Sequence, residues 1–178
     1  MIASVLSLVL SFTAVTDPVV TTVEVNKVPV LSVTPPDLAG IQTEYTSNGA
    51  RFTDASVDLV FKVYYATPAR HPSCEAINSF VATQKELSSF ADSEFAVRVD
   101  TNVNEERCRG DWSRIQRTNN KVVDSRKGVV MTKIFRKGDN SSRSAEVTFA
   151  ASWPAKIDKD AKRLFEIFVA GATVDFDR

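Results

Sequence analysis

Apolar and polar residues alternate most clearly in residues 56–66, SVDLVFKVYYA. A period of two is typical of a β-strand with one buried face and one exposed face. The apolar face of this segment carries Val57, Leu59, Phe61, Val63 and Tyr65. The opposite face carries Asp58, Lys62 and Tyr64. The segment is therefore predicted to be a half-buried strand.

Three later segments, 93–102, 128–138 and 144–153, alternate in the same way. The Lys-Gly-Asp-Asn sequence at 137–140 between the last two suits a hairpin connection, and Asn48-Gly49 is a turn signal earlier in the chain. Hairpin turns join antiparallel neighbours, so this arrangement predicts an antiparallel sheet. A Val/Thr-rich run at 19–33 predicts one or two further strands.

The N-terminal stretch 2–16, IASVLSLVLSFTAVT, has two interpretations. Alternating residues from Leu6 to Ala14 fit a strand, which would open the domain as part of an N-terminal hairpin. A cleaved secretory signal also has an apolar centre and small residues at its cleavage site, but it begins with a positive charge. No Lys or Arg precedes Lys27, and periodicity alone does not decide between the two.

Two segments have helical spacing. Residues 74–91 place apolar side chains where a helix would gather them, and the C-terminal segment has a longer apolar stripe. Its members are Ile157, Ala161, Leu164, Phe165 and Phe168. Asp158 and Asp160 fall in the first turn of this predicted helix, where the helix dipole favours carboxylates, and Gly171 can end it. Residues 103–126 are polar and charged, and we predict that they form turns.

The chain has 178 residues, of which 43% are hydrophobic and 25% are charged, as expected for one globular domain. We therefore predict a single α+β domain over residues 1–178. The formal net charge is zero, but residues 107–143 hold 11 Lys and Arg against 3 Asp and Glu. A basic block that contains Trp112 and Phe135 fits a phosphate-binding surface, and a solvated charged loop is the alternative.

The residues that carry chemistry are few. Cys74 and Cys108 are too few for a zinc-binding pattern, and they form either a disulfide or two free thiols. The glycines are too widely spaced for a phosphate-binding loop, and His71 is the only histidine. These observations predict neither an enzyme, a metal site nor a cofactor, and no apolar run reaches the length of about 20 residues that spans a membrane.

The stretch 142–172, SRSAEVTFAASWPAKIDKDAKRLFEIFVAGA, resembles the C-terminal part of coat proteins of single-stranded RNA bacteriophages. In that family a strand leads through a short connection to an amphipathic helix rich in Phe, Leu and Ala. The segments 128–138 and 56–66 are similar to the preceding strands of the coat-protein sheet. In this alignment residues 67–126 form a helical insertion between two sheet strands.

The resemblance implies a homodimer that assembles into an icosahedral shell around RNA, with no membrane partner and with the virion as its location. It further implies that the helix residues Leu164, Phe165 and Phe168 cover one sheet face of the same or a partner subunit. The other face would bind RNA through five residues. These are Lys62, Tyr64, Lys133, Ser144 and Glu146.

A second hypothesis is a secreted or periplasmic β-rich binding domain. In this alternative, residues 1–16 are a cleaved N-terminal signal and Cys74 pairs with Cys108 in a disulfide.

Overall fold

The computed structural model describes residues 21–24, 30–36, 38, 40–66, 74–90, 93–102, 107–138 and 143–177. The predicted hairpin strand at 6–14 lies outside these residues. The described strands are β1 (Thr21–Glu24), β2 (Val30–Val33), β3 (Ile41–Thr46), β4 (Gly49–Asp54), β5 (Leu59–Ala66), β6 (Ser93–Asn102), β7 (Arg107–Thr118), β8 (Lys121–Arg136), β9 (Ser144–Pro154) and β10 (Thr173–Asp175). The described helices are α1 (Glu75–Phe90), a short 3-10 turn η1 (Ala155–Ile157) and α2 (Asp158–Ala170).

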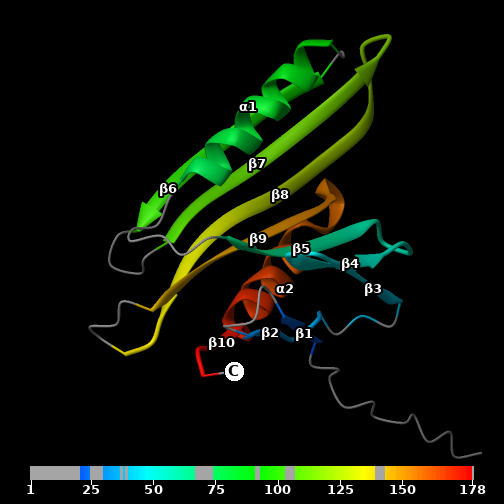
Figure 1. Cartoon of the computed structure of the whole chain (residues 1–178). Coiled ribbons are helices and arrows are strands. Elements are labelled where there is room, and N and C mark those ends of the chain that lie inside the picture. Colours follow the sequence, from blue (N-terminus) through cyan, green and yellow to red (C-terminus); the bar gives the residue numbers. More distant parts are fainter. Residues whose placement is uncertain are drawn as a thin grey trace, which may run out of the picture.

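The centre of the molecule is an antiparallel seven-stranded sheet with the order β3-β4-β5-β9-β8-β7-β6. Figure 1 shows α2 on one side of this sheet and α1 on the other, over the long strands β6, β7 and β8. A small sheet of β1, β2 and β10 lies beside α2. The predicted α+β class with antiparallel pairing is therefore confirmed.

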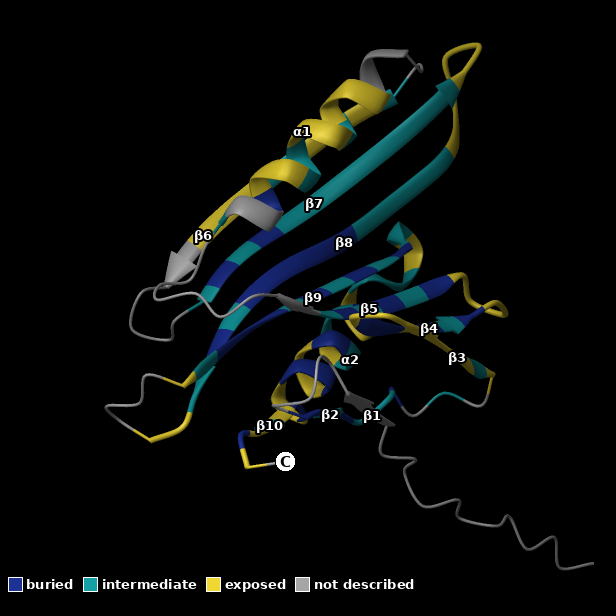
Figure 2. Ribbon diagram, viewed as in Figure 1, coloured by how far each residue is buried: buried dark blue, intermediate teal, exposed yellow. Residues whose placement is uncertain are grey.

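Helix α2 packs through its phenylalanine stripe onto one face of the sheet. The Phe168 ring lies 5.5 Å from Phe52 of β4, 5.4 Å from Phe61 of β5 and 5.9 Å from Phe149 of β9, centroid to centroid. All four rings are fully buried. Figure 2 shows the buried stretches of the central strands and of α2 in dark blue. Aromatic pairs at these separations add to the free energy gained from apolar burial, so this cluster holds three strands to one helix.

Helix α1 covers the opposite face. On β8, Val129 and Met131 belong to the buried cluster under α2, whereas Val130 packs with Ile77 of α1. Successive side chains of a strand point to opposite faces, so the two helices lie on opposite sides of β8. Gly110 of β7 allows the close approach of α1, because a Cβ there would lie 2.9 Å from the Ile77 side chain.

Two sequence predictions are wrong in the region 67–126. Residues 107–118 and 121–126 belong to the long strands β7 and β8 rather than to turns. With β6 these strands make up three of the seven strands of the sheet, so the region is part of the sheet rather than a helical insertion. The apolar alternation is weak here because charged residues pair across strands, as Arg117 does with Glu94 at 3.2 Å. Asn119 and Asn120, with φ of 51° and 62°, make the turn that joins β7 to β8.

The apolar stripe of α2 is covered by the sheet of the same chain. Phe165 and Phe168 are fully buried, and Leu164 packs against the same cluster. A partner subunit is therefore not needed to cover this helix, in contrast to the obligatory dimer that the coat-protein resemblance implied. Within the described residues, neither helix is long and apolar enough to cross a membrane.

Asp158 anchors the start of α2. Its carboxylate accepts hydrogen bonds from Trp153 Nε1 at 3.0 Å and from Lys127 Nζ at 2.9 Å, and Lys162 Nζ lies 3.5 Å away. Burial raises the pKa of Asp158, but the two donors and the positive charge of Lys162 outweigh it and hold the pKa below its ordinary value of 3.8. The carboxylate thus ties the helix to β9 and β8.

We expect Phe168→Ala to lower the free energy of unfolding by about 3–5 kcal/mol, because it opens a cavity among three rings. Ile167→Ala is the matched control, since Ile167 is 57% exposed, and it should change the free energy by no more than about 0.5 kcal/mol. Urea denaturation followed by circular dichroism measures both. Equal losses in the two variants would contradict the packing described.

We expect Asp158→Asn to lower the free energy of unfolding at pH 7 by about 1–2 kcal/mol, because the amide keeps one acceptor but loses the charge. The folded-state pKa of Asp158 is below the unfolded value, so its stabilisation is present above about pH 4 and is lost as the pH falls through the folded-state pKa. The free energies of unfolding of the wild type and the variant should therefore become equal once the pH is below the folded-state pKa. Denaturation series recorded at a set of pH values measure this. Asp160→Asn, at an exposed position of the same helix turn, should show a smaller difference at pH 7.

Candidate functional site

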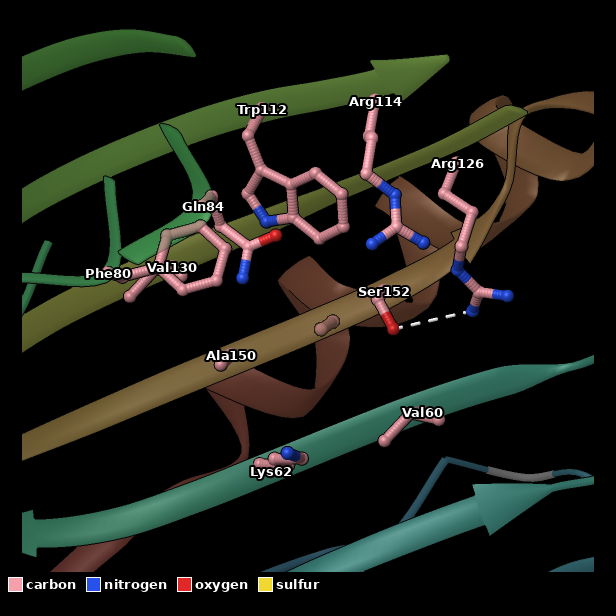
Figure 3. A pocket seen from close by; sticks show the side chains of 11 residues that line it. Val60, Lys62, Phe80, Gln84, Trp112, Arg114, Arg126, Val130, Ala150 and Ser152 are labelled. Carbon is pink, nitrogen blue, oxygen red and sulfur yellow. Dashed lines mark hydrogen bonds between the residues drawn. The ribbon is translucent and has the colours of Figure 1, made fainter. Parts of the chain in front are cut away.

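A pocket of about 240 Å³ lies on the α1 side of the sheet, next to the helix (Figure 3). At this place α1 no longer covers strands β8, β9 and β5. Val130 of β8, Ala150 of β9 and Val60 of β5 form its floor. Ala150 is short, and the helix lies over β6 to β8, so this part of the sheet remains hollow. The floor is an apolar surface open to a small ligand.

The wall of the pocket nearest α1 is aromatic. Trp112 of β7 lies 5.7 Å from Phe80 of α1 and 6.2 Å from Phe95 of β6, centroid to centroid. Its indole crosses Gly128, the residue opposite it on β8, and a Cβ there would lie 2.4 Å from the ring. The glycine is therefore what allows the indole to lie flat against the sheet. Gln84 of α1 completes this wall.

Cationic side chains enclose the rest of the pocket. Arg114 of β7 and Arg126 of β8 are directly opposite in the strand register, and both point to the pocket side (Figure 3). Lys62 approaches from β5, across the floor. Like charges that face each other across two strands destabilise a sheet, so this arrangement calls for anions nearby.

Two carboxylates supply part of that compensation. Arg114 Nη2 lies 3.3 Å from Asp124 Oδ2. Arg126 pairs with the Asp58 carboxylate and donates to the Asp58 carbonyl at 3.1 Å and to Ser152 Oγ at 3.4 Å. Asp58 adopts a φ of 54° in the turn before β5. Both carboxylates belong to the protein, so the two arginines are held in place without a ligand.

Two buried donors at the pocket remain unused. Trp112 Nε1 and Arg114 Nε are both buried, and neither finds an acceptor among the described residues. A buried N–H group without an acceptor costs about 1–3 kcal/mol, so these two groups make the wall of the pocket less stable. The described pocket combines an apolar floor, an aromatic wall and three cations.

The opposite face carries a separate ion cluster. Arg109 of β7 contacts Asp111 at 2.7 Å and Glu166 of α2 at 2.5 Å, and its guanidinium lies 5.9 Å from the centre of the Phe165 ring. Hydrogen bonding to Asp111, then to Glu166, raises the pKa of Arg109 despite its partial burial. This arginine is saturated with partners, so the cluster fastens α2 to β7 rather than offering a binding site.

The five residues predicted to bind RNA do not share one surface. Lys133 lies on the α2 face of β8, beside Phe135, with Nζ 5.1 Å from that ring centre. The other four lie on the α1 face, two on β5 and two on β9. Glu146 is buried rather than exposed to RNA. Of the five, Lys62 alone lines the pocket, because strand alternation and the position of β5 place it there.

Arg114 and Arg126 were not predicted as site residues, although the basic block that contains them and Trp112 is visible in the sequence. The signal that would have found them is Asn119-Asn120. A hairpin turn at this position brings residues 112 to 118 of one strand opposite residues 121 to 128 of the next. Without that turn, the charges were assigned to a loop.

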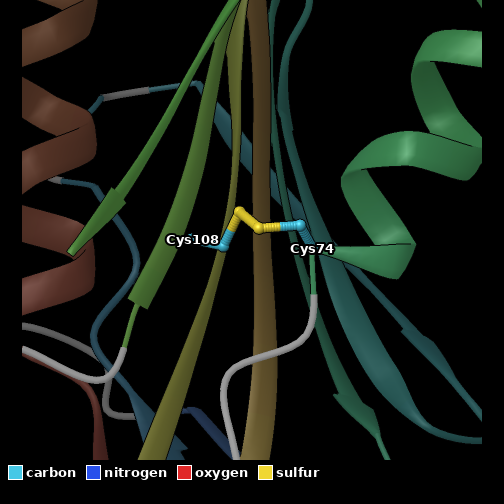
Figure 4. The surroundings of a disulfide bond; sticks show 2 residues. All are labelled: Cys74 and Cys108. Carbon is cyan, nitrogen blue, oxygen red and sulfur yellow. A yellow bond between two sulfur atoms is a disulfide. The ribbon is translucent and has the colours of Figure 1, made fainter. Parts of the chain in front are cut away.

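Cys74 and Cys108 form a disulfide, as one of the two interpretations predicted. Figure 4 shows it joining the chain at the start of α1 to β7. Cys108 is fully buried and packs in one cluster with Ile77 and Val130. Because α1 supplies Phe80 and Gln84 to the pocket, the disulfide also fixes one wall of the site.

No family model and no curated protein sequence matches the chain. Several solved structures match the chain, and two proteins among them illustrate the shared fold. The Ran-binding protein Mog1p of Saccharomyces cerevisiae is 11% identical with a TM-score of 0.51, and the match covers 90% of this chain and 98% of Mog1p. Cyanobacterial PsbP from Synechocystis sp. PCC 6803 is 11% identical with a TM-score of 0.51, covering 92% of this chain and 97% of PsbP.

These matches correct the coat-protein interpretation, because neither protein is a capsid subunit. The assignments to a virion, an icosahedral shell and packaged RNA are withdrawn with it. The resemblance rested on two strands followed by an amphipathic helix, and that local pattern fits any sheet that needs a helix on one face. In this fold the other face, which the resemblance reserved for RNA, is covered by α1 over β6, β7 and β8.

We expect the Cys74→Ala/Cys108→Ala double variant to lower the free energy of unfolding by about 3–4 kcal/mol, as estimated for a closed loop of this length. Urea denaturation with and without a reductant measures the effect. The reduced wild type should match the double variant, and the variant should not respond to the reductant. If reduction of the disulfide left the free energy of unfolding of the wild type unchanged, the disulfide would not stabilise the position of α1.

Proposed function

We propose that the chain is a binding domain of a secreted or periplasmic protein, without catalytic activity, and that it binds an anionic partner in the pocket beside α1. The observation that carries the proposal is the set of three cations, Lys62, Arg114 and Arg126, around an apolar floor. Ligand sites are typically apolar hollows with a few polar groups that orient the ligand. RNA is not part of this proposal.

The disulfide supports the location. Disulfides persist in secreted and periplasmic proteins, whereas the reducing cytosol keeps most thiols free. Cys74 and Cys108 pair in the structure, and neither cysteine is left as a thiol. In this proposal the apolar stretch 2–16 serves as the export signal, and the binding domain follows it.

The chemistry of the pocket supports binding rather than turnover. General acid–base or nucleophilic catalysis needs a base within hydrogen-bond reach of the reacting group. Ser152 is the only hydroxyl among the residues that line the described pocket, and its partner is Arg126, whose guanidinium only donates hydrogen bonds and cannot accept the hydroxyl proton. The described residues also hold no cluster of three metal-ligating side chains. This pocket can hold an anion, but its residues do not activate one.

The comparison adds one supporting point. Mog1p is described as a Ran-binding protein, so this fold serves for binding in at least one protein. An identity of 11% supports a shared fold but not a shared partner, so the Ran binding of Mog1p is not assigned to this chain.

Anilinonaphthalene sulfonate, a monoanionic aromatic dye, tests the pocket directly. We expect one dye molecule per chain, with transfer of excitation from Trp112, and a dissociation constant raised about tenfold in Lys62→Glu because the variant reverses a charge beside the dye. Fluorescence titration of the oxidised protein measures this.

Arg163→Glu is the matched control, because it makes the same charge change at an exposed position of α2. It should bind the dye as the wild type does. Trp112→Leu should lose both the energy transfer and the site. Dye binding that is equal in wild type, Lys62→Glu and Trp112→Leu would overturn the pocket as the binding site.

A further inference from the structure

From the pairing of Arg114 with Arg126, we infer that the ligand of the pocket is a carboxylic acid on a short apolar stem. The carboxylate would lie between the two guanidinium groups, and the stem would lie on the apolar floor against Trp112. This inference rests on the proposed function, and it names the chemical class of the partner. The shared chemistry has two sources, a free aliphatic or aromatic acid and the C-terminal residue of a peptide.

The geometry of the two arginines favours a carboxylate. A guanidinium is a planar fork whose N–H groups match the two oxygens of a carboxylate. Arg114 and Arg126 are directly opposite in register and project from the same face of neighbouring strands, so their guanidinium groups lie side by side in Figure 3. Asp124 and Asp58 bind them from outside the pocket lining. Arg114 Nε stays buried without an acceptor among the described residues.

The charge of the pocket favours an anion of one negative charge. Its three cations, Lys62, Arg114 and Arg126, are offset by two carboxylates, Asp58 and Asp124, which leaves a net charge of +1. A carboxylate neutralises this charge, whereas a phosphate monoester brings about two negative charges at pH 7 and exceeds it. The net charge of the pocket therefore favours binding of a carboxylate over binding of a phosphate monoester.

The size and lining of the pocket define the stem. Its volume of about 240 Å³ is below the 300–1,000 Å³ typical of sites for drug-sized molecules, so it encloses a single ring or a short chain. The pocket is open on one side, so the rest of a larger molecule, such as the dye, would extend out of it. Val60, Val130 and Ala150 offer this stem an apolar floor, and Trp112 offers it a ring face.

Three matched compounds test the head group in isothermal titration calorimetry with the oxidised full chain. They are hydrocinnamate, its amide and phenethylphosphonate, which share a 2-phenylethyl stem and differ in the head group and its charge. We expect hydrocinnamate to bind at one site per chain and to bind about ten- to hundredfold more tightly than the neutral amide, as charge-assisted hydrogen bonds require. Tighter binding of the phosphonate, or equal binding of acid and amide, would overturn the carboxylate assignment.

Arg114→Lys tests the fork while keeping the charge. We expect it to weaken hydrocinnamate binding about tenfold, because lysine offers one ammonium in place of a planar pair of donors. Arg163→Lys, the same change at an exposed position of α2, should bind as the wild type does. Both variants are compared at equal folded fraction by circular dichroism. Unchanged binding in a folded Arg114→Lys variant would overturn the clamp.

A tripeptide Gly-Gly-Phe and its C-terminal amide separate the two sources. A free tripeptide that binds more tightly than hydrocinnamate, with its amide inactive, would assign the site to peptide C-termini. Binding of hydrocinnamate with exclusion of the tripeptide would assign it to a free acid. If the dye binds through Lys62 and Trp112 but none of the carboxylates binds, the carboxylate inference fails while the proposed binding function stands.

Discussion

The two faces of strand β8 are the constraint on which the rest of the structure depends. Val129 and Met131 point into the core under α2, and Val130 between them points to α1. A strand has only two faces, so packing Phe165 and Phe168 against one of them commits the intervening residues to the other. The helices therefore lie on opposite sides of one sheet, and each covers a different half of it.

The pocket is a consequence of that offset. Helix α1 lies over β6, β7 and β8, so no described helix covers the surface of β9 and β5 beside it on this side. Trp112 and Phe80 line the edge of the helix, and Lys62 approaches from the open strands. The disulfide at the start of α1 keeps this edge in place. The candidate binding site therefore lies at the edge of α1, and not in the buried core under α2.

The coat-protein resemblance failed for a physical reason. A pair of alternating strands followed by a helix with an apolar stripe satisfies the same burial requirement in many α+β proteins. The local prediction was sound, because β9 and α2 form where the pattern placed them and Phe168 is buried against the sheet. What the pattern did not contain is the second helix on the opposite face, and that helix changes what this face can do.

Periodicity by itself determined the elements whose side chains separate into apolar and polar faces. These are the strands near 56–66, 93–102 and 144–153, and the helices near 74–91 and 157–171. Each of these elements buries one face, so its apolar residues recur at the spacing of a strand or a helix, and this spacing is visible in the sequence. The strand at 128–138, the later part of β8, was also predicted. Strand β7 and residues 121–126 of β8 were missed because ion pairs across strands replace apolar alternation there, and such pairs have no period within one strand.

Only the tertiary structure decided which cysteine interpretation holds and which residues form the site. Cys74 and Cys108 are 34 positions apart, and the packing of α1 on β7 brings them together. Lys62 joins Arg114 and Arg126 because β5 and β8 both pair with β9, while Lys133 of the same basic block turns to the other face. Strand order and register are set by contacts distant in sequence, so they leave no local signal for a single chain to show.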